Sequence, residues 1–238
     1  MAEGRPFPDT RPSVVRDAID VDPAARARGL DAMARAYWEP THAYVRLRWR
    51  TDDESAKDLT QEFFAHALER ELLHRYDPAR AKLRTYLRLC IDSFVANAFK
   101  AGRRLKRGGA ETHIDVYSVA EFLPTDGRED AEAAFEREWI RALFSGAVDA
   151  LHAECLRTGK ETHFGVFHRY DIEEAEAERR STYADLAVAF DIPVTQVTNY
   201  LAWARRRLRA HVLEVLRAQC GSDAEYRDEA RALLGVRG

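Results

Sequence analysis

The stretch STYADLAVAF-DIP-VTQVTNYLAWARRRLR, residues 181–209, decides the fold of the chain's C-terminal half. Its three blocks predict a helix, a tight turn and a second helix, the layout of a helix-turn-helix. Ala187 is small at the point where two such helices must cross closely. Pro193 suits the first turn of the second helix, because its missing N–H would have no partner there in any case. The first helix turns an apolar face inward, made of Leu186, Ala187 and Phe190, and Ile192 fills the turn.

The second helix of this motif separates apolar from polar positions. The positions that face the core are Val197, Leu201, Ala204 and Leu208. The residues left exposed at its start are Thr195, Gln196, Thr198 and Asn199, where a recognition helix meets base edges in the major groove. Further along stand Arg205, Arg206, Arg207 and Arg209, a set placed to contact phosphates. The alternative is a surface helix whose basic end complements its own dipole.

Charge is distributed unevenly, although the net charge of the 238 residues is only −3. Residues 80–109 carry nine Lys or Arg against the single acid Asp92, a local balance of +8. Residues 111–138 carry nine acids against two arginines, a balance of −7. A basic block beside an acidic one is typical of a DNA-binding chain whose linker stays off the DNA, although charge runs are usually solvated faces.

The N-terminal half shows apolar spacings of three and four from Gly29 onward, with Pro40 marking a turn or kink. Residues 51–54 (TDDE) predict a capping box in which Thr51 and Glu54 exchange hydrogen bonds. The helix that follows has an expected apolar face of Leu59, Phe63, Phe64, Ala67, Leu68 and Leu72. A very apolar helix begins after residues 76–78 (YDP) and ends at Gly108–Gly109.

Almost no strand alternation is visible, so the expected fold class is all-α, with two small helical domains. The expected parts are an N-terminal arm (1–28), a first domain (29–109), an acidic linker (110–134), a second domain (135–217) and a C-terminal extension (218–238). Within the extension, a short helix is expected from Tyr226, Ala230, Leu233 and Leu234.

Composition excludes several classes of protein. Apolar runs long enough to span a membrane are missing and the N-terminus has no apolar leader, so we expect a cytoplasmic protein without a membrane partner. Cys90, Cys155 and Cys220 are too scattered for a disulfide framework or zinc ribbon, and each is expected to be buried. His152 stands three residues before Cys155, but His163 and His168 follow no zinc register, so we expect no metal and no cofactor.

Two groups of motifs in this chain resemble the two conserved domains of one known protein family. The first conserved domain of the extracytoplasmic-function (ECF) sigma factors of bacterial RNA polymerase is similar to residues 58–64 (DLTQEFF), 76–78 (YDP), 83–87 (LRTYL) and 103–109 (RRLKRGG). Their second domain is similar to 183–187 (YADLA) through 198–205 (TNYLAWAR). The resemblance covers roughly residues 30–215, and the DLTQEFF run is its most specific part. It implies a sigma region 2-like bundle and a region 4-like helix-turn-helix, joined by the acidic linker.

The resemblance also implies partners and site residues. The helix that carries DLTQEFF would dock on core RNA polymerase through Asp58, Gln61 and Glu62, unless these side chains merely solvate the helix. Contacts to the promoter's minus-ten element would come from Asn97, Lys100, Arg103, Arg104, Lys106 and Arg107. Contacts to the minus-thirty-five element would come from Thr195, Gln196, Thr198, Asn199, Arg205 and Arg206. Promoter DNA and core polymerase are therefore the implied partners, with an anti-sigma factor as a further candidate.

The chain departs from the family pattern at Asp191, where the turn usually has Gly, and at Pro193, where Ser is common. Asp tolerates left-handed backbone better than most residues. A rival reading is a helix-turn-helix regulator that does not engage polymerase. A third alternative is an enzyme, because the acidic residues 52–54 (DDE) could act as acid and base. No phosphate loop or nucleophile motif accompanies them, so we expect no catalysis.

Overall fold

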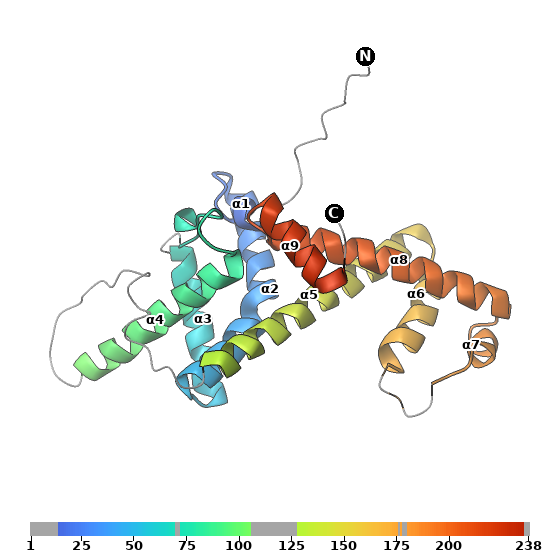
Figure 1. The fold of residues 1–238 in the computed structure, drawn as a ribbon, viewed down its shortest axis with the longest axis horizontal. Helices are drawn as coiled ribbons and strands as arrows, with labels where there is room; N and C mark the ends of the chain where they lie inside the picture. The colour runs from blue at the N-terminus through green and yellow to red at the C-terminus, as the bar shows by residue number, and fades with distance from the viewer. Residues whose placement is uncertain (1–13, 70–71, 106–127, 176, 178–179, 236–238) are drawn as a thin grey trace, which may run out of the picture. The chain divides into compact units, whose positions relative to one another are not determined.

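Helices make up every regular element in the residues that the computed structural model describes, which are 14–69, 72–105, 128–175, 177 and 180–235 (Figure 1). The expected all-α class is confirmed for these residues. The elements in chain order are α1 (Val14–Ala18), α2 (Pro23–Trp49), α3 (Asp53–Glu69), the 3-10 helix η1 (Leu72–Arg75), α4 (Leu83–Leu105), α5 (Arg128–Thr158), α6 (Glu161–Phe167), the π-helix η3 (His168–Glu173), α7 (Tyr183–Ala189), α8 (Val194–Gln219) and α9 (Asp223–Leu234).

The chain forms two compact units. Residues 1–142 and 216–238 make the first unit, and Leu143–Val215 make the second. The long helices α5 and α8 each contribute residues to both units. The chain's C-terminal end therefore belongs to the first unit, which was not foreseen.

Helical structure in the first unit starts earlier than the expected arm of residues 1–28 allows. Residues 1–13 lie outside the described residues, but α1 and the start of α2 fall within that range. Asp22 caps α2, and its carboxylate accepts hydrogen bonds from the backbone N–H groups of Ala24 and Ala25 at 3.2 and 3.1 Å. A Cβ atom at Gly29 would collide with the backbone of α1, so only glycine permits this close packing.

The capping box expected from Thr51 and Glu54 is wrong. Arg50 adopts a left-handed backbone (φ 50°) that ends α2, and α3 starts at Asp53. The residue that precedes the first turn is thus Asp52, whose Oδ1 accepts from the Ser55 N–H at 2.9 Å while its Oδ2 accepts from the Ser55 hydroxyl at 2.8 Å. These hydrogen bonds lower the pKa of Asp52. Pro40 lies inside α2, which continues past it.

The buried face of α3 is narrower than expected. Phe63 is buried as expected, but Leu68 is 48% exposed. With about 100° per residue, Leu68 lies about 110° around the helix from the centre of the buried stripe. Thr60 is buried instead, and its hydroxyl is satisfied by donating to the Ala56 carbonyl at 2.7 Å.

Helix α5 begins within the segment expected to be a linker. Residues 110–127 of that linker lie outside the described residues, whereas 128–134 form the first turns of α5. Glu129 and Asp130 favour a helix start because their charge complements the helix dipole. Ala131 and Ala134 are buried. Because alanine is small, these two residues gave no clear apolar pattern among the acidic residues around them, and the start of the helix was not recognised.

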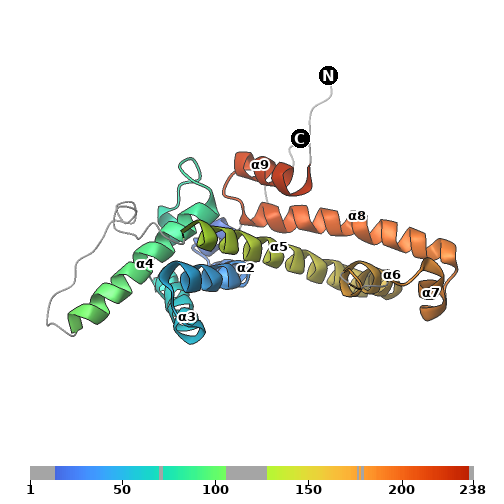
Figure 2. The same cartoon turned by 60° about the horizontal axis from the view of Figure 1, so that its bottom comes forward.

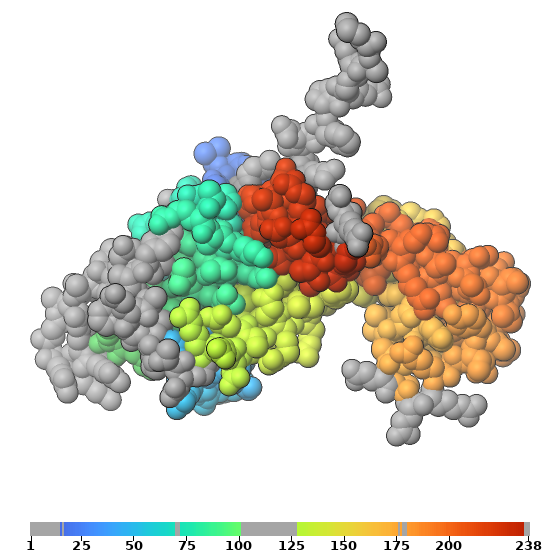
Figure 3. Space-filling view, viewed as in Figure 1, coloured from blue at the N-terminus to red at the C-terminus, as the bar shows by residue number. Residues whose placement is uncertain are grey.

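The expected C-terminal helix is confirmed as α9, but its buried face is largely acidic. Glu225 and Glu229, one turn apart, are only 8% and 2% exposed. Oε1 of Glu225 accepts from the Leu83 backbone N–H at 3.0 Å, and so caps the start of α4. Figure 3 shows the surface of α9 next to that of the first turns of α4. The C-terminal residues thus complete the first unit.

The second unit has its own apolar core, contributed by α5, α6, α7 and α8. The fully buried members are Leu151, Cys155, Val166, Phe167, Leu186, Ala187, Val197, Leu201 and Ala204. Gly159 ends α5 with a left-handed backbone (φ 65°), and the Lys160 N–H reaches back to the Cys155 carbonyl at 2.9 Å. The turn at Gly159 therefore separates α5 from α6.

Candidate nucleic-acid interface

The first helix of the expected helix-turn-helix starts with a complete capping box. The Thr182 hydroxyl accepts from the Asp185 N–H at 3.2 Å, and the Asp185 carboxylate accepts from the Thr182 N–H at 2.8 Å. The capping box thereby gives partners to two backbone N–H groups at the start of α7. Figure 2 shows α7 beside the first turns of α8, the arrangement that the sequence predicted.

The turn between α7 and α8 is a Schellman motif. Asp191 takes a left-handed backbone (φ 50°), its N–H donates to the Val188 carbonyl at 3.4 Å, and the Ile192 N–H donates to the Ala187 carbonyl at 3.0 Å. The expectation that Asp191 replaces the usual glycine by entering left-handed conformation is confirmed. Pro193 directly precedes α8 and accepts from the Gln196 N–H at 2.8 Å.

The inward positions of the motif were predicted correctly. Leu186 and Ala187 of α7 and Val197, Leu201 and Ala204 of α8 are buried. Phe190, Ile192 and Leu208 pack against this core while remaining partly exposed. Val197, Leu201 and Ala204 occupy the core-facing side of α8. The helix period therefore places the residues between them on the outward side.

Of the four expected reading residues, Thr195, Thr198 and Asn199 are exposed at the start of α8. Gln196 is half-buried, and its Oε1 accepts from the Tyr200 hydroxyl at 2.9 Å. Val194, directly before them, is 48% exposed. The start of α8 thus presents hydroxyl, amide and aliphatic groups to solvent, and its first eleven residues (VTQVTNYLAWA) contain no charged side chain.

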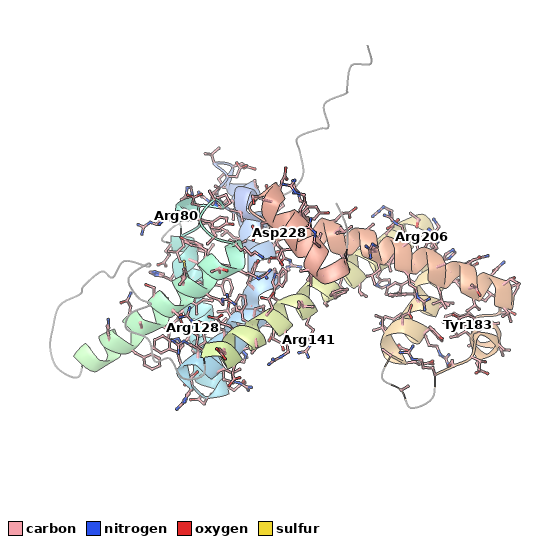
Figure 4. All side chains as sticks on the ribbon, viewed as in Figure 1. Arg80, Arg128, Arg141, Tyr183, Arg206 and Asp228 are labelled. Carbon is pink, nitrogen blue, oxygen red and sulfur yellow. The ribbon has the colours of Figure 1, made fainter. Side chains whose placement is uncertain are left out.

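The arginines further along α8 differ in their ion-pair partners. Arg205 makes a two-pronged ion pair with Asp171, with Nε–Oδ2 and Nη2–Oδ1 distances of 2.8 Å each. Arg207 pairs in the same way with Glu154, which also contacts His211 Nε2 at 2.7 Å. Arg206, which Figure 4 labels on α8, is exposed and has no ion-pair partner among the described residues. Of the four arginines expected to touch phosphates, Arg205 and Arg207 are thus paired with acids, whereas Arg206 is exposed without such a pair in the part of the chain that the structure describes.

The ion pair of Arg207 with Glu154 changes the proton affinity of both groups. Hydrogen bonds from Arg207 lower the pKa of Glu154, against the opposing effect of burial. The matching change at Arg207 raises its pKa, since Glu154 accepts its hydrogen bonds. The pair is therefore ionised throughout the physiological range, and its acid partially cancels the positive charge of α8.

The basic helix expected to meet the minus-ten element is α4. Asn97 is half-buried and Lys100 is exposed on it. Arg103 and Arg104 belong to its last turn, but their side chains lie outside the described part of the structure, as do Lys106 and Arg107 altogether. The structure thus brings Asn97 and Lys100 onto one helix and leaves the positions of the other four side chains undescribed.

The first half of α4 is less basic in effect than its sequence indicates. Arg84 pairs with Glu136 at 2.8 Å and with Glu229 at 2.6 Å, and Arg88 lies 3.8 Å from Glu132. Two of these acids, Glu132 and Glu136, belong to the acidic block of residues 111–138. Internal pairing therefore cancels part of the positive charge that the sequence places on the first half of α4.

The three expected polymerase contacts are all exposed on α3. Asp58 and Glu62 are one turn apart, and Gln61 stands beside Glu62, so the three side chains share one face. Phe63, on the opposite side, anchors the helix in the first unit. The face is acidic and carries an amide donor, a combination suited to a basic partner helix.

Two groups of residues were missed from the sequence. In the first unit, the Tyr44 hydroxyl donates to Asp92 Oδ2 at 3.0 Å, and Arg48 Nε lies 4.0 Å from Asp92 Oδ1. Burial raises the pKa of Asp92, the only acid in the basic block. In the second unit, His163 stacks on Tyr200 with ring centroids 3.6 Å apart. Neither set has a sequence signature, because its members lie on different helices.

The three cysteines are buried, and His152 stacks on an aromatic ring. Cys90, Cys155 and Cys220 are buried, as expected, and burial raises the pKa of Cys90 to about 11 and of Cys220 to about 12. His152 stacks on the Phe164 ring at 4.3 Å. Within the described ranges, no cluster of three or more His, Cys, Asp or Glu side chains has the arrangement of a metal site.

No described helix combines the length and apolar character needed to cross a membrane. Compared with family models, curated proteins and solved structures, the chain matches none of them.

Proposed function

We propose that this protein is a sigma factor of the ECF type, which acts in the cytoplasm, binds core RNA polymerase and directs promoter recognition and DNA melting. The observation that carries the proposal is the exposed, uncharged start of α8, held by a complete helix-turn-helix turn at Asp191. This geometry suits insertion into the major groove, where polar side chains at the start of a recognition helix meet base edges. The protein acts by binding and catalyses no reaction.

In the finer architecture that we propose, residues 29–109, which include most of α2 with α3 and α4, form a sigma region 2-like bundle. Residues 135–217, which include most of α5 with α6, α7 and most of α8, form a region 4-like unit. The acidic segment of residues 110–134 would connect them. The start of α8 would read the minus-thirty-five element. The far end of α4, from Asn97 and Lys100 onward, would meet the minus-ten element, where positive charge holds the backbone of the opened strand.

The polymerase contact is assigned to the face of α3 that carries Asp58, Gln61 and Glu62. Its support is the exposure of all three side chains on one face. Ion pairs across such an interface mainly govern the association rate and its salt dependence. We therefore expect the polymerase complex to weaken as the salt concentration rises.

The test is run-off transcription by full-length protein reconstituted with core RNA polymerase on a library of promoter fragments. The proposal requires initiation from a defined subset of fragments and co-elution of the protein with polymerase. The triple variant Asp58→Ala, Gln61→Ala, Glu62→Ala should lose co-elution. Glu69→Ala is the matched control, an exposed acid on the same helix about 10 Å further along. Sequence-specific DNA binding without co-elution or initiation would instead favour a helix-turn-helix regulator that does not engage polymerase.

A further inference from the structure

The half-buried Gln196 differs from the other reading residues because a neighbour fixes its side-chain amide. The Tyr200 hydroxyl, one turn further along α8, donates to Gln196 Oε1 at 2.9 Å. A primary amide has one accepting and one donating end, and nothing intrinsic decides which way round it faces. In the structure the Tyr200 hydroxyl is the donor and the amide oxygen the acceptor, so Oε1 faces Tyr200 and the NH₂ group faces away from it.

The ring of Tyr200 is packed against an aromatic side chain of α6. The His163 ring of α6 stacks on it at 3.6 Å between centroids with 21° between the ring planes, and Trp203 meets the edge of His163 at 5.2 Å. Lys160 Nζ lies 4.9 Å from the centre of the Trp203 ring. Burial, helped by the charge of Lys160, lowers the pKa of His163, so the stacked imidazole is neutral at pH 7. We call Tyr200, His163 and Trp203 the aromatic brace.

The orientation of the amide matters because the purines differ at their major-groove edges. Adenine presents an N6 donor beside the N7 acceptor, whereas guanine presents two acceptors, O6 and N7. An amide with a fixed oxygen and a fixed NH₂ group matches adenine with two hydrogen bonds. The same amide can satisfy only one of the two guanine acceptors in that pose. Oε1 keeps a second lone pair after accepting from Tyr200, so the brace does not block this pairing.

The other residues at the start of α8 also favour adenine over guanine. We call residues 194–204 the reading end. Guanine is most often read by Arg or Lys, and residues 194–204 contain neither. The first arginine of α8, Arg205, stands about 16 Å along the axis from Val194 and is already paired with Asp171. Val194 offers an exposed aliphatic group, the kind of surface that contacts the methyl group of thymine. Asn199 adds a second exposed amide.

We propose that Tyr200 is a positioning residue for base recognition: through its hydrogen bond to Gln196 it sets that amide to read adenine, and the reading end of α8 selects A·T pairs over G·C pairs. This inference rests on the proposed function, since it deepens the role of the same helix. Tyr200 is half-buried, and its position on the helix would not by itself identify it as a specificity determinant.

The experiment is selection of random DNA duplexes by the full-length chain, followed by sequencing and by run-off transcription of selected sequences with core polymerase. We expect enriched A·T pairs, with adenine favoured over guanine by about tenfold at the position that Gln196 reads. Tyr200→Phe keeps the ring and its stacking but removes the hydroxyl. It should reduce the preference at that single position to below about threefold, with the other positions unchanged. Tyr183→Phe, a partly exposed tyrosine in α7 of the same unit, is the control.

The outcomes separate the two proposals. Enriched guanine, or a Tyr200→Phe profile identical to wild type, overturns the inference even if the holoenzyme initiates normally, and then the proposed function stands. Loss of preference at every position together would mean that Tyr200 only supports the fold, and this also overturns the inference. A chain that selects no sequence and supports no initiation would overturn both.

Discussion

Replacing the buried carboxylate of Glu229 should strongly destabilise the first unit. Its side chain is 3% exposed and receives hydrogen bonds from Arg84, which is 15% exposed, and from Lys82. Removing one partner of a buried ion pair costs about 3–5 kcal/mol, because the other charge stays buried without compensation. Arg84 would keep Glu136 at 2.8 Å and its position over the Trp139 ring. We therefore expect Glu229→Ala to cost about 3 kcal/mol, the low end of that range.

Lys82 adds little to this estimate. Its side chain is 42% exposed, and exposed ion pairs contribute at most about 1 kcal/mol. The appropriate assay is urea unfolding followed by circular dichroism. For a slope of about 2 kcal/mol per molar urea, the midpoint should fall by about 1.5 M. Hydrogen exchange at the Leu83 amide, which donates to Glu225 on the same face of α9, should accelerate in parallel.

Asp228→Ala is the matched control, since Asp228, labelled in Figure 4, neighbours Glu229 but is exposed. Its ion pair with Arg231, at 3.7 Å, is also exposed, and the control should stay within about 0.5 kcal/mol of wild type. A loss below about 1 kcal/mol for Glu229→Ala, or equal losses for both variants, would refute the idea that α9 is held by buried charge.

The same pair predicts a dependence on pH. Burial opposes ionisation of Glu229, but hydrogen bonds from Arg84 and Lys82 outweigh it and lower its pKa. A lowered pKa in the folded state means that the stabilisation is complete above the unfolded pKa, about 4.3, and is lost as the pH falls through the folded value. The stability difference between wild type and Glu229→Gln should therefore shrink below about pH 4. A difference that stays constant down to pH 2 would contradict this account.

Three further outcomes are expected. Arg103→Ala combined with Arg104→Ala should abolish initiation but leave polymerase co-elution nearly intact, and wild-type transcription would count against α4 as the minus-ten element's partner. Asn199→Ala should change base preference by about 1–3 kcal/mol at one position of the selected DNA, and an unchanged profile would remove Asn199 from the reading set. Asp191→Val should cost about 1–2 kcal/mol in chemical unfolding because its backbone is left-handed, whereas Asp191→Gly should be neutral or stabilising; equal effects would contradict the turn geometry.

Features that depend on neighbours along the chain could be predicted from the amino-acid order. The helix-turn-helix could be read from residues 181–209 because helix period, turn chemistry and small residues act over a few positions. Asp191 was expected to enter left-handed backbone and does so. The exposure of Thr195, Thr198 and Asn199 follows from the same period, since Val197 and Leu201 occupy the core.

The partners of charged and amide side chains could not be predicted in this way, because they come from distant parts of the chain. Arg84 looked like part of a basic surface, yet Glu136 and Glu229, 52 and 145 positions away in the sequence, neutralise it. Gln196 looked like its exposed neighbours, yet Tyr200 fixes it with support from His163 on another helix. Counting charges along a chain cannot reveal such pairs, because electrostatic and hydrogen-bond energies depend on distances of a few ångströms in space.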